Sequence, residues 1–198
     1  MTTSSAEATV EPARRGRPRS LDREREILAA AIQALIDDGY DAMSVEGVAA
    51  RAGAGKATLY RRWSNKAELV ADAIREHVAH EIPLADTGDV RADMRSFLTG
   101  FHRAFNGVDG KLLAVFTAER LRNPDLAAAF DERHVKERRA HLYRIVRDAI
   151  ERGDLPADSD AELLAEVGPA IMVHEFTRRG GNLSRDIVNR VMAQFFPE

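Results

Sequence analysis

The chain has 198 residues, of which 44% are hydrophobic and 31% are charged, and its net charge is −3. This length fits one large domain or two small ones, and the apolar fraction is sufficient for a hydrophobic core. The absence of cysteine excludes disulfides, thiolate catalysis and cysteine zinc sites, and no apolar run approaches the roughly 20 residues that span a bilayer.

The charge is unevenly distributed along the chain. Residues 14–66 contain 11 Lys and Arg against 7 Asp and Glu, a balance of +4, whereas residues 67–198 carry −5. A basic front on an acidic remainder is typical of nucleic-acid binding, although an ordinary uneven surface gives similar numbers. The polar first 13 residues lack the charged start and apolar centre of a signal peptide, so we expect a cytoplasmic protein that does not bind membranes.

Residues 1–19 are predicted to form a flexible basic arm, because most of them can bury almost no apolar surface. Its end, residues 14–19, reads Arg-Arg-Gly-Arg-Pro-Arg and contains the Arg-Gly-Arg-Pro core of an AT-hook. Gly and Pro keep such a segment extended, and a narrow A·T minor groove attracts arginine. Either this arm contacts DNA through Arg14, Arg15, Arg17 and Arg19, which we favour, or it is a generic solubilising tail.

Helical periodicity and the absence of strictly alternating strands predict an all-α chain of about nine helices. The first helix is expected from Asp22, as its N-cap, to Asp38, with Gly39 at its end. Two short helices follow, one after Ser44 and one from Lys56 to Trp63, separated by a glycine turn. A bracing helix followed by a helix with a polar side is what a helix-turn-helix needs, so residues 20–66 are predicted to form such a DNA-binding domain.

Further helices are predicted through residues 67–198. Asn65 and Glu68 resemble a capping box for a helix that continues toward Ile82, and residues 83–88 are expected to form a connector. The remaining helices are expected to start at Asp89 and to cover about 111–122, 124–152 with Gly153 after it, 160–179 behind a Ser159–Glu162 capping box, and 184–196.

The run from Ala52 to Leu69 resembles the TetR family of bacterial transcriptional regulators. The Leu59-Tyr60 pair, the aromatic residue at Trp63 and the Asn-Lys-x-Glu-Leu sequence of residues 65–69 stand where that family has them. Many members have His and Phe at the positions of Arg62 and Trp63, and Ser or Thr at that of Gly55. Asn-Pro-Asp-Leu at 123–126 and Gly-Asp-Leu at 153–155 resemble one of the family's common C-terminal types.

The resemblance implies a sequence-specific DNA-binding regulator whose phosphate contacts fix its register and whose base contacts give specificity. Lys66, Tyr60 and the helix N-terminus at Ser44 are expected at phosphates. Lys56, Arg61 and the methyl groups of Ala57 and Thr58 suit base edges, and Arg62 suits either role. Two recognition helices in successive major grooves must lie about 34–36 Å apart, so we expect a homodimer on a palindromic operator.

The resemblance also implies that residues 67–198 form an effector-binding and dimerisation domain. The expected pocket residues are Met94, Phe97, Phe101, His102, Phe105, Phe116, His134, Met172 and Phe176, with ordinary core packing as the alternative for each. The expected dimer residues are Val167, Ile171, His174, Val188, Val191, Met192 and Phe195, whose strips equally suit packing within one subunit.

These features predict a repressor that an unidentified small-molecule effector releases from DNA, through a push on the helix that links the pocket to the DNA-binding part. A regulator without ligand control remains an alternative. The sequence contains no phosphate loop, nucleophile elbow or paired acid motif, so we expect neither an enzyme nor a cofactor. His77, His80 and Glu81 have a spacing that metals tolerate, but a matching further ligand pattern is lacking, so we predict no metal site and keep a metal-responsive regulator as an alternative.

Overall fold

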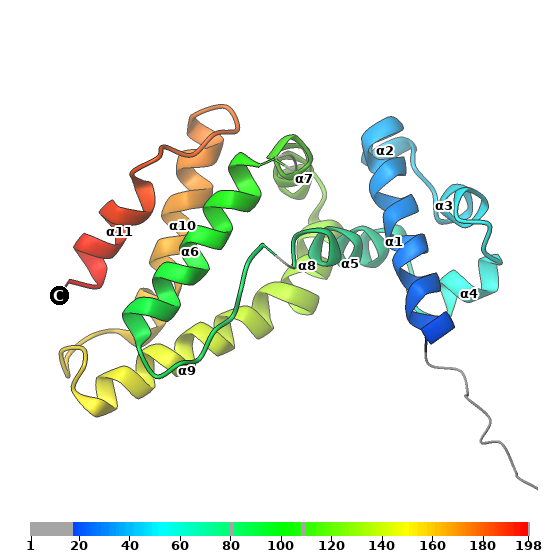
Figure 1. Cartoon of the computed structure of the whole chain (residues 1–198). Coiled ribbons are helices and arrows are strands. Elements are labelled where there is room, and N and C mark those ends of the chain that lie inside the picture. Colours follow the sequence, from blue (N-terminus) through cyan, green and yellow to red (C-terminus); the bar gives the residue numbers. More distant parts are fainter. Residues whose placement is uncertain (1–17, 80, 108–109, 198) are drawn as a thin grey trace, which may run out of the picture.

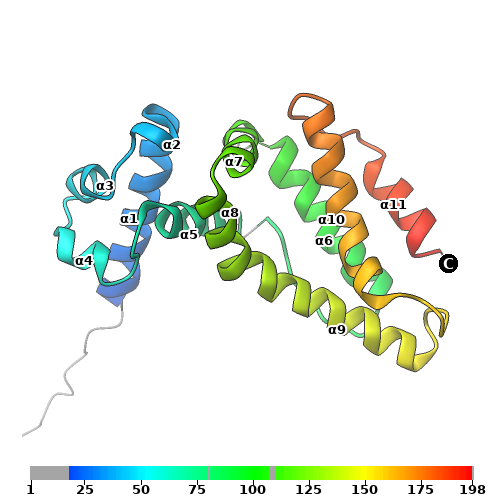
Figure 2. The ribbon, with the colours of Figure 1, turned by 180° about the vertical axis from the view of Figure 1, so that it is seen from behind.

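The computed structural model describes residues 18–79, 81–107 and 110–197, and these residues contain helices without strands. Figures 1 and 2 show a small N-terminal head, made of α1 to α4, and a larger body, made of α6 to α11, with α5 between them. The head and the linking helix consist of α1 (Pro18–Asp37), α2 (Gly39–Ala42), α3 (Val45–Arg51), α4 (Lys56–Tyr60) and α5 (Lys66–Val78). The body consists of α6 (Val90–Asn106), α7 (Gly110–Arg122), α8 (Pro124–Phe130), the π-helical turn η1 (Asp131–Val135), α9 (Lys136–Arg152), α10 (Ala161–Arg178) and α11 (Ile187–Phe195).

The first helix begins earlier than the sequence suggested. Pro18 is its first residue, where a missing N–H costs nothing and the fixed φ suits a helix. Asp22 therefore lies inside α1 and does not cap it. Arg19, which we assigned to the flexible arm, has its backbone in this helix, whereas Arg14, Arg15 and Arg17 lie outside the described residues.

Polar side chains cap the N-termini of α3 and α5. The Oγ of Ser44 accepts a hydrogen bond from the Gly47 N–H at 3.0 Å, and the Oδ1 of Asn65 accepts one from the Glu68 N–H at 3.0 Å, which confirms both predicted caps. The carboxylate of Glu68 in turn accepts from the Ser64 N–H at 3.0 Å. Between α3 and α4 the chain turns at Gly53, whose φ of +61° a side chain would disfavour.

Two expected helix starts in the body were wrong. Asp160, not Ser159, caps α10, because its Oδ1 is the atom that accepts from the Leu163 N–H at 3.0 Å. The last helix begins at Ile187 rather than at Ser184, since a turn precedes it in which the Ile187 N–H reaches the Ser184 carbonyl at 3.3 Å.

The single long helix expected over residues 124–152 is continuous in direction but changes its winding. Regular α-helical turns of α8 give way to the π-helical turn η1 before α9 resumes and ends at Gly153, whose φ is +82°. Single π-helical turns inside α-helices occur often at functional sites. This turn carries Arg133 and His134, which face α5.

The connector after α5 passes close to the middle of α6. A Cβ built on Gly100 would lie 2.1 Å from the Glu81 carbonyl oxygen and 2.6 Å from Cδ of Pro83, so only glycine fits this crossing without a shift. Gly100 is therefore the residue that lets the connector lie against the body.

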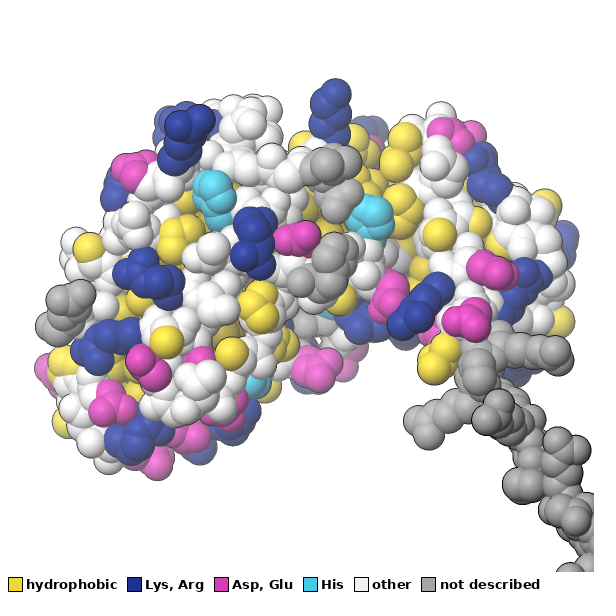
Figure 3. All heavy atoms as spheres, in the orientation of Figure 1, with side chains coloured by type: hydrophobic (Ala, Val, Ile, Leu, Met, Phe, Trp, Pro, Cys, Tyr) yellow, Lys and Arg dark blue, Asp and Glu magenta, His cyan; other side chains and the backbone are white. Residues whose placement is uncertain are grey.

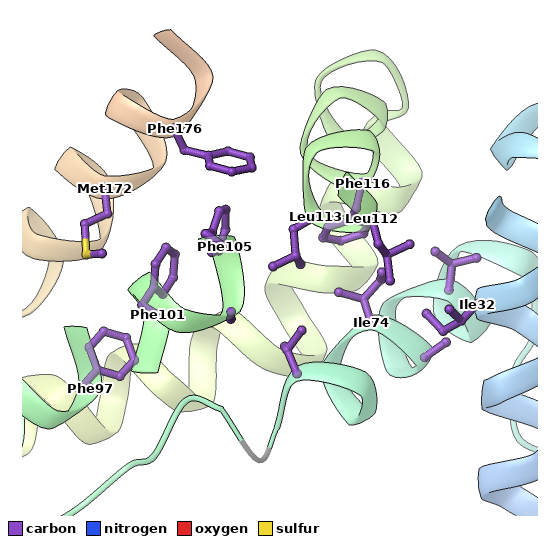
Figure 4. Packing of buried hydrophobic residues seen from close by; sticks show 14 of the residues in the cluster. Ile32, Ile74, Phe97, Phe101, Phe105, Leu112, Leu113, Phe116, Met172 and Phe176 are labelled. Carbon is purple, nitrogen blue, oxygen red and sulfur yellow. The ribbon is translucent and has the colours of Figure 1, made fainter. Parts of the chain in front are cut away.

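A continuous core runs through head, α5 and body. Figure 4 shows Phe97, Phe101 and Phe105 along α6, facing Met172 and Phe176 on α10. Phe101 and Phe105 stack with ring centroids 4.4 Å apart, and Phe105 meets Phe176 edge to face at 4.5 Å. On the outer face in view in Figure 3, Lys and Arg side chains alternate with Asp and Glu. None of the described helices combines the length and the apolar character that crossing a membrane requires.

Candidate nucleic-acid interface

One side of α4 is buried and the other faces solvent. Leu59 and Trp63 are 0% and 1% exposed, which confirms their place in the core. Lys56, Ala57 and Tyr60 on α4 are exposed, and so are Arg61 and Arg62 just after it, while Thr58 is partly buried. Regular α-helix ends at Tyr60, three residues before the expected end, but the Trp63 N–H still bonds the Leu59 carbonyl at 2.9 Å.

Glu46 on α3 orients two of these side chains. Its carboxylate accepts a hydrogen bond from the Tyr60 hydroxyl at 2.9 Å, and the Lys56 ammonium lies 4.0 Å from the same oxygen. A backbone hydrogen bond and the Tyr60 hydroxyl lower the pKa of Glu46, and the carboxylate in turn raises the pKa of Tyr60. Tyr60 thus stays a neutral hydroxyl donor at neutral pH.

The two consecutive arginines differ in their surroundings. Arg62 forms an ion pair with Glu24 on α1. Arg61 is exposed and has no hydrogen bond or ion pair with any residue in the described ranges. Arg61 can therefore bind an anion without first breaking an ion pair or a hydrogen bond to a described residue.

Lys66, expected at a phosphate, is engaged inside the protein. Its ammonium donates to the carbonyl oxygens of Tyr40 at 2.7 Å and Asp41 at 3.1 Å, and it lies 4.5 Å from the centre of the Tyr40 ring. These contacts satisfy carbonyls at the end of α2 and tie α5 to the head. They leave one of the three ammonium donors for a further partner.

Asp72 on α5 joins the end of the α4 segment to the body. Its carboxylate accepts a hydrogen bond from the Trp63 indole at 2.8 Å and from the Arg133 guanidinium at 2.7 and 3.0 Å, and the His134 Nε2 lies 2.9 Å away. Burial alone would raise the pKa of Asp72, but His134, Arg133 and Trp63 outweigh burial and hold that pKa well below its ordinary value of 3.8. We call this cluster of four side chains the Asp72 junction.

The Asp72 junction lies on α5, and Figure 2 shows this helix between α1 of the head and α8 of the body. Trp63 follows α4 directly, and Arg133 and His134 belong to η1. One carboxylate therefore links η1 to the segment that follows α4.

Two cavities of the body border on this region. The larger, with a volume of about 470 Å³, is open to solvent and is lined by residues of α6, α7, η1, α9 and α10. The smaller, of about 230 Å³, lies beside the end of α5 and the connector. Arg138 lines both cavities, and His134 lines the smaller one.

The sequence identified the wall of these cavities only in part. Of the nine expected pocket residues, Phe101 lines the larger cavity and His134 the smaller. The residues that line neither cavity are Met94, Phe97, His102, Phe105, Phe116, Met172 and Phe176. All of these except His102 are buried in the packed core, as Figure 4 shows for the aromatic ladder, because the spacing that could line a cavity equally serves helix packing. The His102 Nε2 lies 3.1 Å from the Ser184 carbonyl oxygen, so it binds the last loop.

Sequence reasoning missed Arg138 and Arg120. Arginines on amphipathic helices usually face solvent, and nothing in the local pattern marks these two as cavity residues. Only the packing of α7, η1, α9 and α10 brings them together at one cavity.

The expected dimer residues divide into two groups. Val188, Val191 and Met192 are buried within the subunit, where α11 packs against α6 and α10, which is the alternative that their spacing left open. Val167, Ile171, His174 and Phe195 keep exposed surface. A shallow groove lined by Ile171, Ile187 and Phe195 runs between α10 and α11.

His80, one of the three residues with metal-like spacing, lies outside the described residues. Within the described ranges, no group of three or more His, Asp or Glu side chains is arranged to hold a metal ion.

Comparison with known proteins gives a consistent result. A family profile described as bacterial regulatory proteins of the tetR family matches residues 27–73, and a profile described as the tetracyclin repressor-like C-terminal domain matches residues 84–195. The DNA-binding transcriptional repressor TetR of Mycobacteroides abscessus is 34% identical over 181 residues, which are 86% of this chain and 90% of that protein. The HTH-type transcriptional regulator YdeS of Bacillus subtilis is 30% identical over 150 residues, 76% of each chain.

Solved structures share the fold. The TetR family transcription regulator SCO0332 has a TM-score of 0.69 at 25% identity and covers 89% of this chain and 98% of its own. FadR of Bacillus subtilis, crystallised in complex with stearoyl-CoA, has a TM-score of 0.63 at 18% identity and covers 87% of this chain and 98% of its own. From the two profiles and the relative in Mycobacteroides abscessus, the chain belongs to the TetR family of bacterial DNA-binding transcriptional regulators, and it is not an enzyme.

Proposed function

We propose that this protein is a homodimeric repressor in the bacterial cytoplasm, which binds a palindromic operator and leaves it when a small molecule fills the larger cavity. The relative in Mycobacteroides abscessus is named a transcriptional repressor, which supports repression over activation. The observation that carries the proposal is the outward-facing side of α4, braced from behind by Leu59 and Trp63.

The proposed DNA contacts follow from the exposure of these side chains. Arg61 and Lys56 meet base edges, where a guanidinium pairs with O6 and N7 of guanine, and Ala57 and Thr58 offer methyl groups to thymine. Tyr60 and the N-terminus of α3 at Ser44 bind phosphates. The further proposed phosphate or groove contacts are Arg62, Lys66, and Arg14, Arg15, Arg17 and Arg19.

Two copies of α4 are required to contact successive major grooves, which are about 34–36 Å apart. The surface on α10 and α11 that includes Ile171 and Phe195 supports a two-fold contact, because it combines apolar and half-exposed residues at the end of the molecule away from α4 (Figure 1).

Effector control is proposed to run through the Asp72 junction. A ligand in the larger cavity touches η1 through Asp131 and Val135, and η1 holds Asp72 through Arg133. A shift of η1 then changes the position of α5 and of Trp63, and with it the spacing of the two heads. The stearoyl-CoA complex of FadR supports ligand binding by this fold. The ligand acts only if it binds the two states with unequal affinity.

The test uses the DNA that flanks the protein's own gene. Wild type should bind this DNA in a gel shift, and Arg61→Ala should weaken binding about 10- to 100-fold at constant salt, because one base-reading side chain is lost from each half-site. Arg147→Ala on α9 is the matched control, since Arg147 is exposed and pairs only with Asp148 and Glu151 among the described residues. Equal affinity of both variants would remove α4 from the DNA contact.

Ligand control is tested separately. Compounds that raise the melting temperature of wild type are added to the gel shift, and at least one should release the DNA without being turned over. A protein that binds such compounds yet keeps its DNA affinity is a regulator without ligand control, contrary to the proposal.

A further inference from the structure

Arg138 is the unusual residue of the larger cavity. Its guanidinium lies 6.0 Å from the centre of the Phe97 ring and forms no hydrogen bond or ion pair with the described residues. Burial lowers the pKa of this guanidinium, and repulsion by Arg120 lowers it further, against a weaker attraction by Asp131. Arginine nevertheless stays protonated in proteins, so this half-buried side chain brings to the cavity wall a positive charge that forms no ion pair with a described residue.

The other charges of the cavity are already paired. Arg120 Nη2 lies 2.5 Å from Asp131 Oδ1, and Arg139 forms an ion pair with Glu166. The two charges within each pair offset each other, and the side chain of His174, which also lines the cavity, is exposed. The positive charge of Arg138 therefore remains in excess at this wall.

Arg120 contributes a second free donor. Its Nε is buried and has no hydrogen-bond partner within the described ranges, although its Nη2 is held by Asp131. The guanidinium carbon lies 4.9 Å from the centre of the Phe130 ring, so packing fixes the plane of this side chain. An unsatisfied buried N–H is a costly arrangement in the empty protein.

The rest of the wall is apolar. Phe101, Leu142, Ala165, Pro169 and Val173 line the cavity together with the arginines. The volume of about 470 Å³ falls within the range of roughly 300–1,000 Å³ that is usual for small-molecule sites. The cavity thus offers space for an apolar body beside a place for a negative head group.

We infer that the effector is an amphipathic anion, whose carboxylate, sulfonate or phosphate binds Arg138 while its apolar body lies against Phe101, Leu142 and Val173. This inference rests on the proposed effector role of the cavity and names the chemical class of the ligand. Charge-assisted hydrogen bonds to guanidinium groups are among the stronger polar contacts in proteins.

A pair of dyes tests the charge requirement directly. The probe 1-anilinonaphthalene-8-sulfonate carries a sulfonate, and N-phenyl-1-naphthylamine has the same rings without it. Both report binding by increased fluorescence. Wild type should bind the sulfonate at least about 10-fold more tightly than the neutral dye, because the free energy of one hydrogen bond to a charged group corresponds to about this ratio of affinities.

Arg138→Gln removes the charge and leaves a shorter, neutral polar side chain. It should weaken binding of the sulfonate about 10-fold or more and leave binding of the neutral dye within about two-fold. Arg138→Lys, which keeps the charge, should restore most of the affinity for the sulfonate. Arg147→Gln, on the same helix but outside the cavity, is the matched control and should change neither dye.

A measurement without ligand covers the case in which a variant is damaged. Because Arg138 is half-buried and forms no ion pair with a described residue, Arg138→Gln should leave the melting temperature within about 2 °C of that of wild type. Equal affinity of wild type for both dyes, an equal loss of both dyes in Arg138→Gln, or a larger fall in the melting temperature of that variant would each overturn the inference.

The outcome is separable from that of the proposed function. If the sulfonate binds through Arg138 but no ligand changes DNA affinity, the anion site stands and ligand-gated repression fails. If neutral compounds release the DNA and binding is independent of Arg138, repression stands and the anion class is wrong.

Discussion

At the scale of single residues, Asp72 has the strongest polar environment in the described part of the chain. Its side chain is 15% exposed and meets donors from two distant segments, Trp63 nine residues before it and Arg133 sixty-one residues after it. A buried carboxylate is unfavourable by itself, and its hydrogen bonds to charged and neutral donors reverse that penalty. Asp72 thus serves both the stability of the head–body contact and its geometry.

Asp72→Asn should lower the free energy of unfolding at pH 7 by about 2–3 kcal/mol, because it removes the carboxylate that accepts two hydrogen bonds from Arg133 and leaves only the longer ion pair with Glu68. The pKa of Asp72 is lower in the folded than in the unfolded chain, so its contribution is complete at pH values well above 3.8 and is lost as the pH falls below that value. Urea denaturation at several pH values should therefore show a gap between wild type and variant that narrows on acidification.

The control for this variant is Glu132→Gln on the same π-helical turn. Glu132 pairs with Lys136, and both side chains are about 70% exposed, so its loss should change stability by less than about 0.5 kcal/mol. A gap for Asp72→Asn that is as small as the control, or that grows as the pH falls, would contradict the role of this carboxylate.

Local and distant residues differ in how far the sequence predicts them. Ser44 and Asn65 could be recognised as caps, because a cap depends on the next three residues only. The inward place of Leu59 and Trp63 follows equally from helical spacing. In contrast, the partners of Asp72 and the isolation of Arg138 depend on segments far apart in the chain, and no local pattern encodes them.

At the scale of elements, the connector after α5 decides how the body is attached. Its backbone at Glu81 and Pro83 lies directly on α6 at Gly100, and Arg103 reaches back to the Glu81 carboxylate at 3.2 Å. The sequence predicted a connector near residues 83–88 but not its path, since a close backbone approach leaves no signal other than one glycine inside a helix.

Gly100→Ala should lower the free energy of unfolding by about 1–3 kcal/mol, despite the higher helix propensity of alanine. The added methyl group would overlap the carbonyl of Glu81, and a backbone cannot rotate away as a side chain can. Thermal unfolding measures the change. Thr99→Ala, at an exposed neighbouring position of α6, is the control and should change stability by less than about 0.5 kcal/mol. A Gly100→Ala variant more stable than wild type would disprove the close crossing.

The π-helical turn illustrates a second limit at this scale. The start signal at Asn123-Pro124 and the stop signal at Gly153 predicted one helix from Pro124 to Arg152, and the chain indeed stays helical there. The change of winding at η1 places both Arg133 and His134 against Asp72, which is a tertiary contact. Periodicity therefore gives the extent of such a helix, and the packing partner determines its local geometry.

At the scale of the whole molecule, the head and the far end of the body have separate proposed tasks. Figure 1 shows α4 at one end of the molecule and α11 at the other, with α5 between them. The proposed DNA contact and the proposed contact between subunits therefore do not compete for one surface. The coupling between these two contacts has to pass through the body. The larger cavity and then the Asp72 junction lie along this path.

The contact between subunits leads to a prediction for the whole assembly. Ile171 is half-buried and lines the groove between α10 and α11. Ile171→Glu should put one charge from each subunit into a two-fold interface, so the variant should be monomeric. Sedimentation or light scattering at micromolar concentration should show half the mass of wild type, and operator affinity should fall at least 100-fold because a monomer holds one half-site only. Leu121→Glu is the control, since Leu121 is 79% exposed on α7, and it should remain dimeric. A dimeric Ile171→Glu variant with unchanged operator affinity would place the subunit contact elsewhere on the body.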